Sequence, residues 1–140
     1  MAGINAGRVI GGGVVAGLVM NVIDVVTNGV ILNARWEAET KRLGIDMSQQ
    51  SQGVAGWVTY DFIAGIVLVW LYASIRPRYG PGPKTAVIAG LALWFITHLA
   101  FASWVFTGLY SFGVVAASTV GGLVAGVAGG LAGCAVYKEA

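Results

Sequence analysis

Apolar residues fall into four long runs along the chain, separated by polar or proline-rich connections. Each run approaches the roughly 20 residues that a helix rising about 1.5 Å per residue needs to cross a bilayer. We therefore predict four membrane-spanning helices, over residues 9–33, 54–75, 85–107 and 111–136. Short connections make consecutive spans antiparallel neighbours. The predicted fold class is all-α, an antiparallel four-helix bundle in the membrane.

The connections between the predicted spans differ in whether they can form helix. Residues 34–53 form the one long polar connection, and its stretch 35–43 consists of good helix formers. We expect this stretch to extend the first helix beyond the bilayer until Gly44 stops it. Residues 76–84 hold three prolines and two glycines, which forbid a helix and predict a tight, stiff turn.

Composition supports the membrane assignment. Of the 140 residues, 57% are apolar and only 10% are charged, against roughly 25% charged in soluble proteins. The 22 glycines cluster inside the apolar runs, as in membrane helices that pack closely. We treat the chain as a single domain over residues 1–140. We expect its first run to be a retained span and not a cleaved signal peptide, because it is too long for one and contains Asp24.

The few charged residues predict an orientation and partners. A net charge of +2 without a Lys/Arg cluster argues against nucleic acid as a partner, and leaves membrane lipid, other membrane subunits or a second copy of the chain. Arg8, Arg76, Arg78, Lys84 and Lys138 fall on the side of the termini, and Arg35, Lys41 and Arg42 on the other. The positive-inside rule then predicts cytoplasmic termini. Within the proline-rich turn, Arg76, Arg78 and Lys84 can bind anionic headgroups for about 1 kcal/mol each, and protein docking there is the alternative.

One face of the first span is both small and polar. At 100° per residue, the members of this face lie within an arc of roughly 80°; they are Gly13, Gly17, Asn21, Asp24 and Asn28. The face either lines a cavity or ion path, or it packs closely on a neighbour and hydrogen bonds to it. Asp24 is the harder residue to explain structurally, because a carboxylate near the bilayer centre costs about 2.5–3.5 kcal/mol.

Helical rise places three ionisable residues at one depth. Counted from residues 10, 76 and 85, Asp24, Asp61 and His98 lie about 21, 22 and 20 Å from the side of the termini, and Gly122 lies opposite them at about 22 Å. We predict that these ionisable groups form one polar cluster with Asn21 and Asn28. In it His98 neutralises one aspartate as a cation or as a hydrogen-bond donor, and desolvation or the two asparagines keep the other neutral. The cluster is either a functional site or a set of polar contacts that only hold the helices together.

The cofactor is unknown, and several kinds of chemistry can be weighed. A haem held by two histidines is excluded within one chain, because His98 is the only histidine. His98 could ligate a pigment or bind a quinone among Trp94, Phe95, Phe101 and Trp104, or simply pack between these rings. We predict no metal site, because Asp24, Asp61 and His98 follow no ligand spacing motif. No nucleophile stands beside a base, and Cys134 suits a small buried position, so the chain is expected not to be an enzyme.

The fourth span carries two rows of small residues at every fourth position. One row is Ser118, Gly122, Gly126 and Gly130, and the other is Ala125, Gly129 and Gly133. Such rows are typical of close helix contact and suggest two packing partners, one of which could be another chain.

Residues 70–86, with Arg76-Pro-Arg-Tyr-Gly-Pro-Gly-Pro-Lys84 at their centre, resemble a segment of small bacterial membrane proteins with four predicted spans. The resemblance implies a bundle in the bacterial inner membrane and brings no catalytic residues. We expect a non-enzymatic accessory subunit or homo-oligomer that packs through its glycine faces. The alternatives are a transporter or proton-conducting protein that uses the Asp/Asp/His cluster, and a pigment- or quinone-binding subunit.

Overall fold

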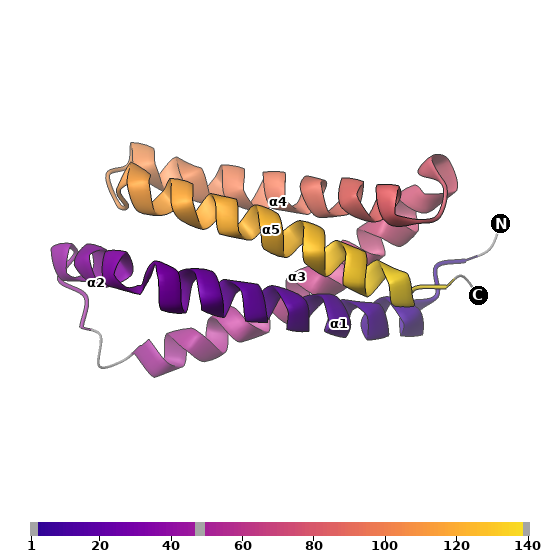
Figure 1. Ribbon diagram of the computed structural model, residues 1–140, viewed down its shortest axis with the longest axis horizontal. Helices are drawn as coiled ribbons and strands as arrows, with labels where there is room; N and C mark the ends of the chain where they lie inside the picture. The colour runs from indigo at the N-terminus through magenta and orange to yellow at the C-terminus, as the bar shows by residue number, and fades with distance from the viewer. Residues whose placement is uncertain (1–2, 47–49, 139–140) are drawn as a thin grey trace.

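The computed structural model describes residues 3–46 and 50–138, which contain helices and no strand (Figure 1). Its elements in chain order are α1 (Ala6–Asp24), the π-helix η1 (Val25–Ile31), α2 (Asn33–Arg42), α3 (Gln50–Tyr79), α4 (Pro83–Phe106) and α5 (Phe112–Val136). Four segments are long and apolar enough to cross a membrane: Ala6–Ile31, Gly53–Tyr79, Pro83–Phe106 and Phe112–Val136. The predicted all-α bundle of four spans is therefore confirmed, and the chain is an integral membrane protein.

The four spans run in alternating directions, so the bundle has two distinct ends. Both termini and the α3–α4 turn lie at one end, which we call the terminal end (Figure 1). The short helix α2 and the α4–α5 connection lie at the other end, which we call the α2 end. Helix α1 packs against both α3 and α5, and α4 packs mainly against α5.

The prediction that residues 76–84 exclude helix is wrong for their first part. Helix α3 continues through Pro77 to Tyr79. Proline removes one backbone donor, but the last turn of a helix at the membrane surface tolerates that loss better than the interior does. The helix ends at Gly80, whose positive φ of 81° is accessible to glycine and whose N–H donates to the Arg76 carbonyl at 2.8 Å. Helix α4 then begins at Pro83, a residue suited to a first turn.

The sequence predicted that the first helix extends straight into the polar connection. In the structure it does not. Residues 25–31 form a π-helix, and the N–H of Leu32 donates to the Thr27 carbonyl five residues earlier, at 2.9 Å. At Leu32 the backbone leaves helical geometry, with φ −99° and ψ 3°. The expected helix over 35–43 exists as the separate helix α2, and Gly44 follows its end with a φ of 69°.

Glycines bring the helices into backbone contact. A Cβ at Gly12 of α1 would lie 2.6 Å from the Gly133 carbonyl of α5, and one at Gly90 of α4 would lie 2.5 Å from the Gly126 carbonyl. Real Cβ atoms do not approach other atoms so closely, so each position requires glycine.

The two small-residue rows of α5 lie against two helices of the same chain. Gly122, Gly126 and Gly130 lie against His98, Gly90 and Ala86 of α4, and Gly129 and Gly133 lie against Met20, Gly12 and Ala16 of α1. On the first span, Gly13 and Gly17 lie against Ile66 and Phe62 of α3. Ser118 differs from its row, because its hydroxyl donates to Asn28 of η1.

Candidate functional site

The structure brings Asp24, Asp61 and His98 to one small cavity in the middle of the bundle. Asp24 comes from the end of α1, Asp61 from α3 and His98 from α4, and Gly122 of α5 also lines the cavity. The cavity measures about 50 Å³. Since one water occupies about 30 Å³ of liquid, this is room for one or two water molecules.

The two aspartates are partners of each other. Their carboxyl groups line the same cavity from α1 and α3 and interact with each other, and Asp61 is only 5% exposed. An ionised carboxylate only accepts hydrogen bonds, so a bond between two carboxyl groups requires a proton on one of them. Two carboxyl groups placed together in the membrane interior can therefore be joined by a hydrogen bond only when the pair holds a proton.

His98 bonds to its own helix and not to an aspartate. Its Nδ1–H donates to the Trp94 carbonyl at 3.2 Å, and the ring stacks on Trp94 with centroids 6.1 Å apart. Because a carbonyl only accepts, we assign the proton to Nδ1, which leaves the Nε2 lone pair on the side of Gly122. Within residues 3–46 and 50–138, His98 forms no ion pair with either aspartate, so the predicted neutralisation by His98 is not what the structure contains.

The two asparagines of the polar face bind neighbouring elements outside the cavity. Asn21 donates its amide to the Gly17 carbonyl at 2.9 Å and to the Val58 carbonyl of α3 at 3.3 Å. Asn28 accepts from Trp36 of α2 at 3.1 Å and from Ser118 of α5 at 3.0 Å. The polar face of the first span thus divides into helix-binding asparagines and one cavity-lining aspartate.

Aromatic side chains cover the cavity toward the α2 end. The His98 ring contacts Phe101, one turn along α4, with centroids 6.3 Å apart. Trp36 of α2 contacts Phe101 at 6.5 Å and Tyr110 at 5.5 Å, and it also donates to Asn28. Trp36 therefore bridges the helix that carries His98 and the segment that follows Asp24.

Helix α2 is attached to the α4–α5 connection by a group that sequence reasoning missed. Glu39 accepts from the Ser111 N–H at 3.3 Å, at the start of α5, and Arg42 binds Glu39 at 2.7 Å and the Leu109 carbonyl at 2.5 Å. The bonds from Ser111 and the Arg42 guanidinium hold the pKa of Glu39 below its ordinary value of 4.5. The Glu39–Arg42 spacing is visible in the sequence, but Ser111 lies 72 residues away and carries no local signal.

Toward the terminal end the cavity is closed by tightly packed apolar residues. Ala16, Leu68, Val69 and Ala89 have no exposed surface. The helix–helix contacts at the glycines described above hold the helices around these side chains close together.

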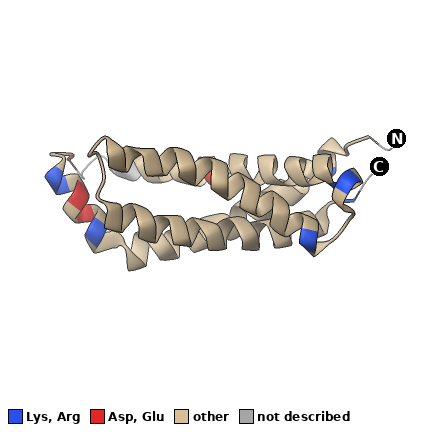
Figure 2. Cartoon of the chain, turned by 90° about the horizontal axis from the view of Figure 1, so that it is seen from above, with Lys and Arg blue, Asp and Glu red and all other residues tan. Residues whose placement is uncertain are grey.

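The predicted headgroup-binding residues lie at the terminal end in two different settings. Arg78 and Lys84 are exposed. The guanidinium of Arg76 lies over the Tyr137 ring, 5.8 Å from its centroid, and is partly buried. Figure 2 shows that Lys and Arg gather at the two ends of the bundle, while acidic residues occur at the α2 end and near the middle.

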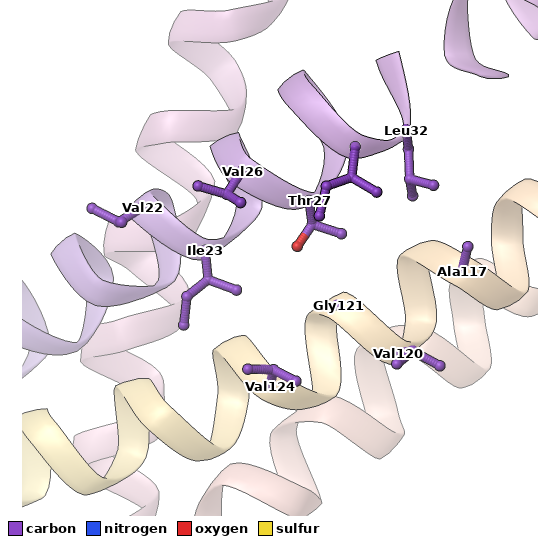
Figure 3. A pocket seen from close by; sticks show the side chains of 10 residues that line it. Val22, Ile23, Val26, Thr27, Leu32, Ala117, Val120, Gly121 and Val124 are labelled. Carbon is purple, nitrogen blue, oxygen red and sulfur yellow. The ribbon is translucent and has the colours of Figure 1, made fainter. Parts of the chain in front are cut away.

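A second, larger hollow is an apolar groove of about 470 Å³ between the first span and α5 (Figure 3). Its walls include Val22, Val26 and Ile31 on one side and Val120 and Val124 on the other. Neither aspartate nor His98 lines it. The groove is therefore separate from the polar cavity.

Comparison of the chain with protein-family models, with curated proteins and with solved structures finds no match. The resemblance of residues 70–86 to small bacterial membrane proteins stays a prediction.

Proposed function

We propose that this protein is a proton-coupled integral membrane protein, in which the Asp24–Asp61 pair takes up and releases protons during transport. The observation that carries the proposal is the cavity itself: ionisable side chains from three helices line it, and two of them are carboxyl groups that interact with each other. Intramembrane carboxyl groups commonly form proton relays. Nε2 of His98 is a further proton acceptor on the same cavity.

A purely structural role explains the carboxyl groups less well. An ionised carboxylate costs about 2.5–3.5 kcal/mol near the bilayer centre, even on the lenient scale, and a pair that shares one proton still carries one such charge. Asn21 and Asn28 already hydrogen bond the first span to its neighbours at lower cost. A bundle that needed only adhesion between helices would not require two carboxyl groups in addition.

The accessory roles have less support from the geometry. The glycine rows of α5, which the sequence assigned to packing partners, lie against α1 and α4 of the same chain. A cavity of about 50 Å³ beside His98 is far smaller than the 300 Å³ or more typical of ligand pockets, and a pigment or quinone would not enter it. Partners other than lipid stay a prediction.

The proposed setting is the bacterial inner membrane, with both termini in the cytoplasm. The larger number of Lys and Arg residues at the terminal end supports this orientation. The α2 end then faces outward, and protons reach the cavity from outside the cell.

Proton uptake into liposomes containing the purified protein tests the proposal. With a pH-sensitive dye inside and an imposed membrane potential, the parent protein should acidify the lumen. Asp61→Asn should reduce this uptake to the level of protein-free liposomes, because an amide cannot exchange the proton. Glu37→Gln, an exposed carboxyl group on α2, is the matched control and should leave uptake unchanged. Equal uptake by the parent and Asp61→Asn would refute the proposal.

A further inference from the structure

We propose that α2 is a hinged lid, which Glu39 and Arg42 hold shut against residues 108–111 and which opens the cavity to water at the α2 end. The lid would regulate access to the Asp24–Asp61 pair, so its role in transport rests on the proposed function. Three features carry the inference: a plug, a latch and a hinge.

The plug is the side chain of Trp36. It contacts Phe101 of α4 and donates to Asn28, and these two residues lie one turn beyond His98 and Asp24 toward the α2 end. Trp36 thus stands between the cavity and the aqueous phase at that end. It belongs to α2 and not to a spanning helix, so moving α2 removes it.

The latch is a set of polar contacts at the membrane surface. Arg42 donates to the Leu109 and Gly108 carbonyls and to Glu39, and Glu39 accepts from the Ser111 N–H at the start of α5. The Arg42 side chain is 49% exposed, whereas Glu39 is only 7% exposed. The bonds from Arg42 to the Leu109 and Gly108 carbonyls are therefore the part of the latch that water replaces most readily.

The hinge is the π-helix η1, which connects the lid to α1. None of its seven residues is buried. η1 touches α5 at two points, where Thr27 packs on Gly121 and Asn28 accepts from Ser118. Beside these contacts lies the apolar groove of about 470 Å³, which leaves room for displacement (Figure 3). A segment with few buried contacts opens at low cost, and π-helical turns inside helices often mark functional sites.

Access from the other directions is closed more firmly. Toward the terminal end, Leu68 and Val69 are fully buried beneath glycine-mediated helix contacts. On the α3 side the cavity wall includes Tyr60, which is 45% exposed and lies within the span Gly53–Tyr79. The proposed route for water to the carboxyl pair is displacement of α2.

Thiol accessibility of the cavity tests the lid. Cys134 is the only cysteine, so Thr97→Cys in a Cys134→Ala background places one thiol on the cavity wall. The protein in lipid nanodiscs is treated with a charged, water-soluble methanethiosulfonate reagent. Arg42→Gln should speed labelling about tenfold. Losing one charge-assisted hydrogen bond raises the population of the open lid by about this factor, and the labelling rate follows that population. Trp36→Phe, which loses the donor to Asn28, should speed it as well.

The matched control is Lys41→Gln, which removes the same charge from an exposed position next to Arg42. Its labelling rate should equal that of the parent, and far-UV circular dichroism verifies that every variant keeps its helix content. Labelling of Arg42→Gln and Trp36→Phe at the parent rate would overturn the lid. Equal acceleration by Lys41→Gln would overturn it too, because surface charge alone would then explain the rate.

Thiol labelling does not depend on proton transport. The experiments can therefore contradict the lid without contradicting proton exchange at the aspartate pair, and the reverse. Faster labelling in Arg42→Gln, combined with proton uptake that Asp61→Asn leaves unchanged, supports the lid and overturns proton exchange. Labelling at the parent rate, combined with uptake that Asp61→Asn abolishes, overturns the lid and supports proton exchange.

Discussion

Two neighbouring glycines of α1 meet very different surroundings. Gly11 has no atom within 4 Å of the position that a Cβ would take, whereas a Cβ at Gly12 would lie 2.6 Å from the Gly133 carbonyl oxygen. The contacting atom belongs to the backbone of another helix, so it cannot turn away as a side chain would. One methyl group therefore decides whether α1 and α5 can keep their present distance.

We predict that Gly12→Ala destabilises the bundle by about 1–3 kcal/mol, the usual cost of overpacking a core. Gly11→Ala should be neutral or stabilise by up to about 1 kcal/mol, because alanine is the better helix former. Reversible unfolding of both variants in mixed detergent measures the difference. Equal stability of the two variants would show that the α1–α5 contact relaxes freely.

The polar residues of the first span have two roles: the asparagines hydrogen bond to neighbouring helices, and the aspartate lines the cavity. Amides both donate and accept, so Asn21 and Asn28 can satisfy partners on neighbouring helices with neutral groups. Asp24 is placed where another carboxyl group can share its proton. An aspartate in the membrane interior is tolerated in this structure because its charge need not be present.

Hydrogen bonds from Glu39 and Arg42 hold the short helix α2 against the segment that leads into α5. Glu39 lies at the N-terminus of α5, where unpaired backbone N–H groups and the helix dipole favour a negative charge. The same carboxylate accepts from Arg42. Both contacts need ionised Glu39, so the attachment of α2 is expected to depend on pH.

We predict that the stabilising effect of Glu39 disappears at acid pH. Because its pKa in the folded protein lies below 4.5, the contribution is complete above that value and is lost as pH falls through the lowered pKa. Glu39→Gln should lower the unfolding temperature by about 2–4 °C near neutral pH. The groups that face Glu39 are Arg42 and Ser111.

The measurement is the difference in unfolding temperature between the parent and Glu39→Gln across pH. Titration of the aspartates and of His98 affects both proteins and cancels in the difference. The difference should vanish below the lowered pKa. A difference that persists unchanged into strong acid would mean that Glu39 acts through packing and not through its charge.

The whole bundle has two unequal ends. The terminal end is held by tight helix contacts and by hydroxyl groups, with the Asn5 N–H donating to Tyr137 at 3.3 Å and the Gly82 N–H donating to Tyr72 at 3.1 Å. The α2 end is held by surface bonds and aromatic rings around a separate helix. This difference makes the α2 end the side from which the cavity can open.

Orientation in the cell follows from the distribution of Lys and Arg. In a Cys134→Ala background, we predict that Lys41→Cys reacts with an impermeant thiol reagent in intact bacterial cells, whereas Lys138→Cys reacts only after permeabilisation. Both residues are exposed, so the comparison reports sidedness and not burial. The opposite labelling pattern would place the α2 end in the cytoplasm and reverse the direction of proton entry.

The order and length of the apolar runs were sufficient to predict four antiparallel spans, because a bilayer imposes one helix length and leaves few other folds. Helical rise also predicted that Asp24, Asp61 and His98 lie at one depth. Depth alone could not determine which groups bond, because that depends on the rotation of each helix about its axis.

Only the tertiary structure revealed that the aspartates pair with each other and that His98 bonds to Trp94. It also located the lid, since Glu39 and Ser111 are 72 residues apart and meet only after α4 and α5 have packed. Hydrophobic length is a local property of a sequence and can be read directly. Side-chain contacts between helices depend on close packing at glycines, and this is decided by all the spans together.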